Sequence, residues 1–297
     1  MDERLAAHLE LAGLSDDEFV ERAFRFVMRR PPDDEARAEA VTSLRTHLLS
    51  RAALLAQLVA SEEFDRLRAL DDAVTRAAAA RAADEHPHEL ESPGDVDERP
   101  VEIAWTLGRY RGEARVLDVG YAFAEPDWLV ALARARPREL VGVDLVEREV
   151  PGMKSVVADL RRLPFPDRSF DVVFCISTLE HVGQENTRYG SSDEADDAAP
   201  ATALRELHRV TARGGRILLT VPCGDRAETD WFLWQPASAW RALFSDADLY
   251  VYDEEVYVRS EDRWRSGPHD GQGVLCAELH PGRLRHELVR RLRGGFR

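Results

Sequence analysis

The sequence predicts an α/β protein: a mostly parallel sheet with helices on both faces, preceded by a small all-helical domain. From about residue 101 onward, short apolar runs alternate with segments of helical period, which is the pattern of an α/β sheet. Two of these runs, 116–119 and 140–144, carry an acid at or near the carboxyl end. Before residue 70, apolar residues recur instead with the helical period of 3.6 residues.

Residues 1–81 are expected to form the helical domain. Ser15 and the three acids that follow it begin one helix, and Pro31-Pro32 ends it. Further helices are expected to begin near Asp33 and Ser50, and a short last one near Ser61. This framework loosely resembles a small bacterial helical domain that is often found beside glycan-modifying enzymes. The resemblance implies docking or oligomerisation rather than chemistry, and we expect a homo-oligomer.

Residues 82–100 are expected to be a linker, because they are rich in Glu, Asp, His and Pro and poor in apolar residues. His86 and His88 lie there, where a solvated linker explains them better than a metal site does. Residues 101–297 are expected to form the sheet domain. Its last segment, Arg283–Arg297, is predicted to be an exposed helix with a frayed tail.

The sheet domain is expected to contain seven strands. A helix is predicted at Ala201–Val210, where Leu204, Leu207 and Val210 have helical spacing. The strands are predicted at Arg115–Val119, Leu140–Asp144, Ser155–Ala158, Asp171–Ser177, Gly215–Val221, Asp248–Val258 and Gly273–Leu279.

Composition excludes several classes of function. The net charge of −15 leaves no basic footprint for nucleic acid, so we expect no nucleic-acid partner. No apolar run approaches the length of a membrane span, so we expect a cytoplasmic protein without a membrane partner. The three cysteines are far apart and form no CxxC pair, which argues against a disulfide framework or a zinc knuckle.

The turn after the first strand is the first candidate site. Asp118-Val119-Gly120 places an acid and a tight turn at a strand end, where glycine lets the backbone approach a ligand. Asp144, at the end of the next strand, is placed to bind a ribose diol, as in a Rossmann-like nucleoside site. The turn lacks further glycines. Tyr121 and Phe123 either cover a bound cofactor or belong to the core.

Several later segments extend this pattern. They are Val157-Ala158-Asp159-Leu160, Leu163-Pro164-Phe165-Pro166, the run from Ser169 to His181, and Gly214-Gly215 with the apolar run to Pro222. In this order and spacing, residues 116–222 resemble class I S-adenosylmethionine-dependent methyltransferases.

The resemblance implies a Rossmann-like sheet and S-adenosylmethionine as cofactor. It assigns Asp118 and Gly120 to the amino-acid end of the cofactor and Asp144 to the ribose hydroxyls, and Tyr121 and Leu145 are further candidate cofactor-binding residues. It assigns Asp159 and Leu160 to the adenine, and Ser177 and Thr178 to the methyl-transfer side.

The loop Glu180-His181 follows the fourth strand and faces the expected methyl group. A neutral imidazole can take the proton of a hydroxyl nucleophile, so His181 is the candidate general base, with Glu180 beside it. His181 could instead only orient the loop. In the family, such a Glu-His pair can also help to hold a divalent metal, here Mg²⁺ with Asp193 as a third ligand. A solvated acidic loop is the alternative explanation of Asp193 and its neighbours.

The acceptor is expected to bind between the strand ends and the segments inserted after them. Tyr189, Trp231 and Trp234 are the candidate substrate-binding residues, because aromatic rings stack on sugars and bases. The two tryptophans could equally belong to the core or to a subunit interface. The pattern of residues 180–224 also resembles bacterial methyltransferases of sugars and polysaccharides, some of which serve natural-product pathways. It implies an O-methyltransferase for a sugar hydroxyl, on a nucleotide deoxysugar, a glycosylated natural product or a polysaccharide precursor.

Two other classes of function stay open at this point. An NAD-type oxidoreductase would also have a Rossmann-like sheet, but it prefers a glycine-rich loop for its pyrophosphate, and Glu125 would repel phosphate. A non-catalytic adaptor that retains the methyltransferase fold would use the helical domain for docking.

Overall fold

The protein is described by a computed structural model that covers residues 13–28, 30–83, 92–93, 97–184, 187, 196–225, 231–259, 263–268 and 270–282. The chain divides into two compact units, Met1–Asp71 and Asp72–Arg297. The division falls inside helix α5 (Glu62–Ala82), whereas the sequence-based boundary at residue 81 lies at the end of this helix. Tyr189, Asp193, His86, His88 and Arg283–Arg297 lie outside the described residues.

The first unit contains α2 (Asp16–Val27), α3 (Asp34–Arg45), α4 (Arg51–Val59) and the start of α5. Ser15 and Glu18 form a capping box at the start of α2, and the side chains of Asp33 and Ser50 cap the next two helices. Apolar residues of α2, α3 and α4 form one core. The helix α5 has 21 residues rather than being short. No Gly or Pro interrupts residues 62–82, and alanine is the best helix former.

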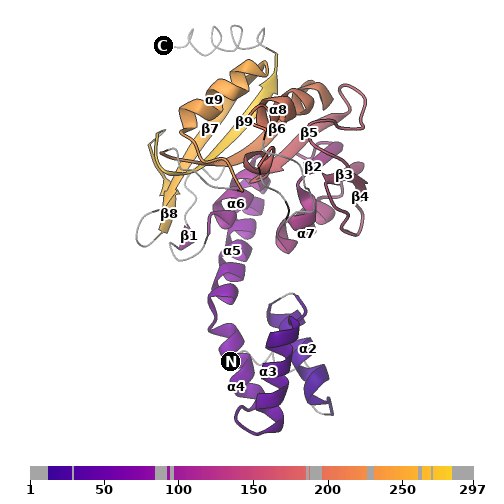
Figure 1. Ribbon diagram of the computed structural model, residues 1–297, viewed down its shortest axis with the longest axis vertical. Helices are drawn as coiled ribbons and strands as arrows, with labels where there is room; N and C mark the ends of the chain where they lie inside the picture. The colour runs from indigo at the N-terminus through magenta and orange to yellow at the C-terminus, as the bar shows by residue number, and fades with distance from the viewer. Residues whose placement is uncertain are drawn as a thin grey trace. The chain divides into compact units, whose positions relative to one another are not determined.

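The second unit is built on one sheet in the order β1-β8-β7-β9-β6-β5-β2-β3-β4 (Figure 1). Five neighbouring strands of this sheet, β6, β5, β2, β3 and β4, are parallel to one another. The strand β9 is antiparallel to both β6 and β7. The α/β, Rossmann-like fold class is therefore confirmed. The strands are β1 (Ser92–Pro93), β2 (Arg115–Val119), β3 (Glu139–Asp144), β4 (Lys154–Val157), β5 (Phe170–Ile176), β6 (Thr211–Cys223), β7 (Leu249–Arg259), β8 (Arg263–Ser266) and β9 (Gly273–Pro281).

Helices cover both faces of this sheet. They are α6 (Arg99–Arg109), α7 (Pro126–Ala135), α8 (Ala199–Val210) and α9 (Ala237–Asp246), with single turns η1 (Tyr121–Phe123) and η2 (Leu179–His181). The helix α6 begins inside the segment expected to be a linker. Pro100 occupies its first turn, and the side chains of 100–109 are buried, so this segment belongs to the folded unit.

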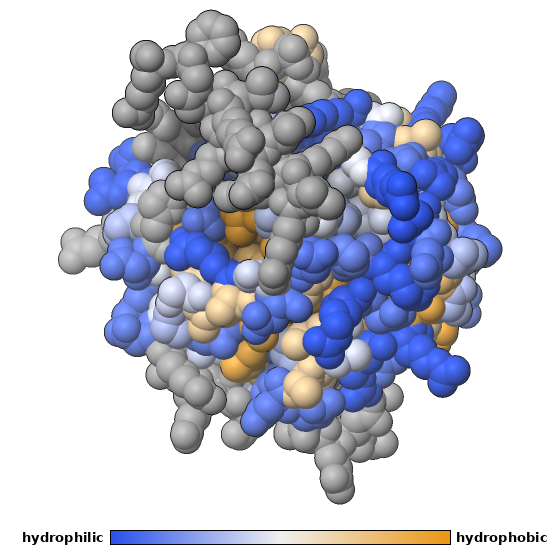
Figure 2. Space-filling view, turned by 90° about the horizontal axis from the view of Figure 1, so that it is seen from above, coloured by the Kyte–Doolittle hydropathy of each residue, from blue (hydrophilic) through white to orange (hydrophobic). Residues whose placement is uncertain are grey.

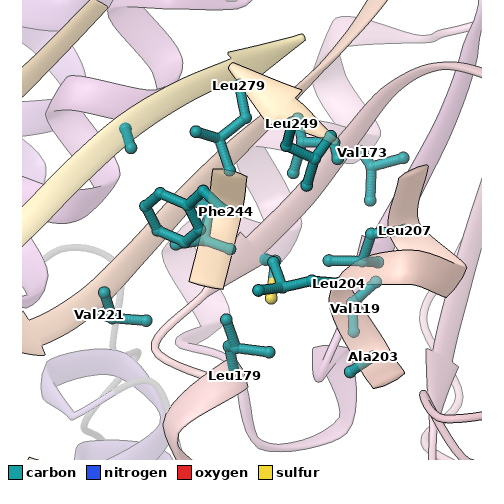
Figure 3. Close-up of a cluster of buried hydrophobic side chains, with 14 of the residues drawn as sticks. Val119, Val173, Leu179, Ala203, Leu204, Leu207, Val221, Phe244, Leu249 and Leu279 are labelled. Atoms are coloured by element: carbon teal, nitrogen blue, oxygen red, sulfur yellow. The ribbon is translucent and has the colours of Figure 1, made fainter. Parts of the chain in front are cut away.

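The face under α8 and α9 holds the main apolar core. Figure 3 shows Leu204 and Leu207 of α8 and Phe244 of α9 among side chains of five strands. Alternate residues of a strand point to opposite faces, so Leu117 and Val119 of β2 enter this core while Asp118 faces the other way.

The face under α6 and α7 combines aromatic and polar groups. Phe174 of β5 meets Trp128 of α7 and Tyr110, directly after α6, edge to face, with ring centroids 5.0 and 5.7 Å apart. Glu102 and Arg109 of α6 are fully buried there. This face is therefore also buried, but it carries charges.

The face of the molecule that Figure 2 shows is mostly polar. Figure 2 shows hydrophilic residues over most of the coloured surface on the face in view, with smaller apolar patches between them. Among the described residues, no helix combines the length and the apolar character that crossing a bilayer requires.

Candidate active site

A cavity of about 200 Å³ lies at the carboxyl ends of β2, β3 and β5. Parallel strands end at the same edge of a sheet, so residues that are distant in the sequence meet there. The cavity brings together most of the predicted site residues: Asp118, Gly120, Asp144, Leu145, Asp159, Leu160, Ser177, Thr178 and His181.

Gly120 is required by the geometry of the first turn. Its φ of 78° lies in the left-handed region, and a Cβ there would lie 2.2 Å from Oγ1 of Thr178. Its N–H donates to the carbonyl of Val143 at 2.9 Å, which joins the turn to β3. The remainder of the loop needs no further glycine because Ala122 lies in η1, a right-handed helical turn.

Asp144 is held in place by the same turn. Its carboxylate accepts the N–H of Ala122 at 2.9 Å and the N–H of Leu145 at 2.7 Å. Burial raises the pKa of Asp144, although these N–H donors favour the charged form. The turn that follows β2 thus positions the acid that follows β3.

Asp118 is a buried acid in the cavity wall. Nε1–H of Trp128 donates to Oδ2 of Asp118 at 2.9 Å. Burial raises the pKa of Asp118 to about 7, in spite of this hydrogen bond. A cationic ligand group beside it would stabilise the charged form and lower that pKa again.

Tyr121 lies in the core, contrary to its predicted contact with the cofactor. Its side chain is fully buried and does not line the cavity. Its hydroxyl accepts the N–H of Arg148 at 3.0 Å, and its ring packs against Gly142, where a Cβ would lie 2.7 Å from the ring. Phe123 does line the cavity and is 54% exposed, so it is the aromatic residue of the turn that can cover a ligand.

Asp159 lines the cavity but is already engaged. Arg161 donates to its carboxylate from the side chain at 2.5 Å and from the backbone N–H at 2.7 Å. Burial would raise the pKa of Asp159, but these bonds outweigh burial and lower it. An adenine amino group would therefore share this carboxylate with Arg161 rather than meet an unoccupied one.

The hydroxyls of Ser177 and Thr178 are directed to the protein. Ser177 has a φ of 41°, and its Oγ donates to Oε1 of Glu102 at 2.6 Å. Thr178 Oγ1 donates to the carbonyl of Ile176 at 2.8 Å. These residues shape the wall of the cavity, and their hydroxyl protons are already used.

His181 lines the cavity with a defined tautomer. Its Nδ1 lies 2.9 Å from the carbonyl oxygen of Trp231. A carbonyl only accepts, so Nδ1 carries the hydrogen and Nε2 is the basic nitrogen of the neutral ring. The ring stacks on Trp231 with centroids 5.0 Å apart. The base predicted from the sequence is thus oriented by the segment after β6.

Glu180 is buried behind His181 and does not line the cavity. Burial raises the pKa of Glu180 to about 8, and the negative charge of Glu102 adds to the shift. The carboxyl is therefore mostly neutral at pH 7 in these surroundings. Among the described residues, no group of three or more His, Cys, Asp or Glu gathers to hold a metal. The Mg²⁺ expectation gains no support here.

The predicted acceptor residues Trp231 and Trp234 form an aromatic cluster with Phe232. Centroids of Trp231 and Phe232 are 4.8 Å apart, and those of Phe232 and Trp234 are 5.9 Å apart. Neither tryptophan lines the cavity, and Trp234 packs closely over Gly224. His181 stacks on Trp231 and also lines the cavity, so it connects this cluster to the cavity.

Sequence reasoning missed the residues that α6 and α7 bring to the cavity. Arg99 and Ile103 come from α6, and Trp128 comes from α7. The apolar spacing of Val101, Trp105 and neighbouring residues, after a proline, could have predicted α6 as a packed helix. Nothing in the sequence indicated that Arg99 would face the strand ends.

Part of the chain is similar in sequence to known methyltransferases. Residues 117–219 match the sequence model of a family described as methyltransferase domain. A malonyl-acyl-carrier-protein O-methyltransferase of Halorhodospira halophila is 29% identical over 188 residues, which cover 54% of this chain and 59% of that protein. The chain thus matches less than two thirds of the length of this curated relative. The matched segment, residues 117–219, spans the parallel strands of the Rossmann-like sheet from β2 to most of β6.

Solved structures show more distant likenesses. The (4+2)-cyclase SpnF is 18% identical with a TM-score of 0.48, covering 75% of this chain and 96% of that one. The 1,6-didemethyltoxoflavin-N1-methyltransferase of Burkholderia thailandensis is 17% identical with a TM-score of 0.43, covering 72% and 87%. Both TM-scores are below 0.5, so neither likeness carries an argument about function.

Proposed function

We propose that the protein is an S-adenosylmethionine-dependent O-methyltransferase that acts on a sugar hydroxyl, in a nucleotide deoxysugar or a glycosylated precursor. The observation that carries the proposal is the cavity that joins Asp118, Gly120 and Asp144 to His181. When bound, S-adenosylmethionine supplies an electrophilic methyl group.

The chemistry of the cavity fits this cofactor. Asp144 offers carboxylate oxygens at the end of β3, which suits a ribose diol. Val143, Leu145 and Leu160 supply apolar wall against which a nucleoside base can pack. Asp118 supplies an acid that suits a cationic group. This set favours a cationic nucleoside over a pyrophosphate.

His181 is proposed to act on the acceptor. Its Nε2 is the basic nitrogen, because Nδ1–H is held by the carbonyl of Trp231. It can therefore take the proton of a sugar hydroxyl as the oxygen attacks. Stacking on Trp231 restrains the ring, so the base is positioned before the acceptor binds.

A second candidate acceptor is a carboxylate. The curated relative is by name an O-methyltransferase of a malonyl group on an acyl-carrier protein, and such a group ends in a carboxylate. A carboxylate is already deprotonated at pH 7 and needs no base. Replacing His181 should therefore slow methyl transfer to a hydroxyl acceptor but not to a carboxylate acceptor, and this difference distinguishes the two classes.

Binding of the cofactor is tested by isothermal titration calorimetry with S-adenosylhomocysteine and with NADH. We expect the protein to bind S-adenosylhomocysteine, and Asp144→Asn to weaken it by about 10- to 100-fold through lost charge-assisted hydrogen bonds. Glu147→Gln is the matched control, because Glu147 is exposed and does not line the cavity. Binding of NADH without S-adenosylhomocysteine would falsify the proposal.

The role of His181 is tested by methyl transfer to nucleotide sugars, with His181→Asn and, as control, His208→Asn on α8. For a hydroxyl acceptor we expect His181→Asn to lower kcat by about 10²- to 10⁴-fold, which is the usual contribution of a general base. Affinity for S-adenosylhomocysteine should stay unchanged. A variant that methylates a carboxylate acceptor at the normal rate would instead support the second candidate.

The first unit is proposed to serve docking or self-association. Phe26, Leu48 and Val59 are large apolar side chains that remain exposed on it, and Leu48 is 81% exposed. Light scattering of the full chain and of a Leu48→Asp variant tests this role. A monomeric wild-type chain would exclude self-association.

A further inference from the structure

Arg99 lines the cavity from a helix that lies outside the segment matched by the family. It is the first residue of α6, and the matched segment begins at residue 117. Its side chain remains 30% exposed, and Nη1 donates to Oε2 of Glu102 at 2.9 Å. A guanidinium has five N–H donors, so this bond leaves most of them to face other groups.

Glu102 is built to hold Arg99 in this position. Its carboxylate is fully buried and does not line the cavity. Oε1 accepts the hydroxyl of Ser177 at 2.6 Å and that of Thr220 at 2.8 Å, while Oε2 accepts from Arg99. Both carboxylate oxygens are thus engaged by donors on three separate segments. Such a network restrains the guanidinium from behind.

Arg99 is set apart by its electrostatic surroundings. The other arginine of the described lining, Arg161, is engaged by Asp159 inside the cavity. Asp118 and Asp144 are acidic lining residues and repel an anion. Arg99 has its partner Glu102 behind the wall, so its charge is available on the cavity side.

Arg99 also keeps its charge in this partly buried position. Burial alone would lower its pKa, but the nearby acidic groups, Glu102 first, outweigh burial and raise it. A guanidinium binds a carboxylate through parallel N–H donors, which makes arginine the usual residue for this task.

We propose that Arg99 is a specificity-determining residue that binds a carboxylate of a ligand in the cavity, and that Glu102 is its positioning residue. The inference rests on the proposed function for the identity of the cavity. The carboxylate has two possible sources: the amino-acid end of the cofactor, or an acidic acceptor. Both present the same chemistry to the guanidinium.

The cofactor source is tested with two ligands that differ in the carboxylate. Calorimetry of the full chain compares S-adenosylmethionine with its decarboxylated analogue, which keeps the sulfonium and the amine. We expect the wild-type chain to prefer the carboxylate ligand by about 10- to 100-fold, and Arg99→Met to abolish this preference. Arg99→Lys should restore part of it, because the charge is kept but the paired donors are lost.

The acceptor source is tested in the same chain saturated with S-adenosylhomocysteine. Saturation-transfer NMR compares malonate with dimethyl malonate, which has the same skeleton without charge. If the carboxylate belongs to the acceptor, malonate should bind to wild type but not to Arg99→Met, and the cofactor preference should be unaffected. Glu102→Gln should weaken the preferred carboxylate ligand less than Arg99→Met does, because the amide oxygen can still accept either the two hydroxyls or the guanidinium.

Arg161→Met is the matched control. It also removes an arginine from the cavity wall. We expect it to change the affinities for the charged and the uncharged ligand of each pair by the same factor, so that the preference for the carboxylate is kept. Thermal melting establishes that each variant is folded. The proposal is overturned if Arg99→Met leaves both ligand preferences intact, or if it lowers the affinity for charged and uncharged ligands equally. Failure of the wild-type chain to bind either sulfonium ligand would overturn the proposed function, and the malonate comparison, repeated without S-adenosylhomocysteine, would still test Arg99.

Discussion

The face of the sheet under α8 and α9 is apolar, whereas the face under α6 carries buried charges. Consecutive residues of one strand show the difference. Leu219 and Val221 of β6 enter the apolar cluster, while Thr220 between them bonds to Glu102. On the same face as Thr220, Arg216 and Glu278 are almost fully buried and form an ion pair at 3.3 Å.

The contrast indicates that the two faces of the sheet have different roles: the apolar face mainly stabilises the fold, and the charged face also positions the wall of the cavity. Apolar packing tolerates little change in shape but needs no specific partner. Buried charges need partners, and at the strand ends those partners position the cavity wall. We therefore expect substitutions on the apolar face to act on unfolding, and substitutions on the charged face to act also on pH dependence and binding.

The largest expected loss of stability comes from the apolar face. Phe244 of α9 is fully buried in the cluster of Figure 3. Phe244→Ala should lower the free energy of unfolding by about 3–5 kcal/mol, because it removes buried area and leaves a cavity. Urea denaturation measures the loss. If the affinity for S-adenosylhomocysteine of the folded variant falls by more than a few fold, the proposed separation of the two faces is wrong.

Two buried glutamates should give opposite pH dependence. Burial raises the pKa of Glu180 to about 8, so ionising this group costs stability as the pH rises from about 4.5 to 8. Glu180→Gln should therefore match the wild type near pH 4 and exceed its stability above pH 8, by on the order of 2–4 kcal/mol. Thermal unfolding across this pH range measures the difference.

Glu278 is the control for this test. Burial would raise its pKa, but the hydrogen bond to His280 and the charge of Arg216 outweigh burial and lower it to about 2. Its contribution to stability is present above about pH 4.5 and is lost as the pH falls through about 2. Glu278→Gln should thus destabilise the protein at pH 7 and approach the wild type in acid. Parallel pH curves for the two variants would contradict the assignment of these charges.

The smallest expected effects come from two substitutions at neighbouring positions of β6, one that makes a polar residue apolar and one that makes an apolar residue polar. Thr220→Val removes a donor to Glu102, and Val221→Thr places a hydroxyl in the apolar cluster. Each should cost about 1–3 kcal/mol, for opposite reasons. Only Thr220→Val should also weaken the binding of the carboxylate ligand, because it loosens Glu102 behind Arg99. Equal effects of both variants on ligand binding would argue against this link.

Much of the fold could be predicted from the sequence because its signals are local. The strands of the parallel part follow from short apolar runs, and the caps at Ser15, Asp33 and Ser50 mark helix starts. Gly120 and Asp144 could be placed in the site because each directly follows or ends a strand, and parallel strands share one carboxyl edge. The start of α6 was missed because Arg99 and Pro100 directly follow a polar segment that has the composition of a linker.

The sequence by itself determined the class of fold, the edge of the sheet that carries the site, and the residues that end the strands. These depend on hydrophobic period and on turns, which act over a few residues. Only the tertiary structure decided that Tyr121 is core, that Asp159 is paired with Arg161, and that Glu102 lies behind Arg99. Burial and charge pairing of this kind join segments that are distant in the sequence, such as Glu102 and Thr220, which are 118 residues apart, so no local pattern encodes them.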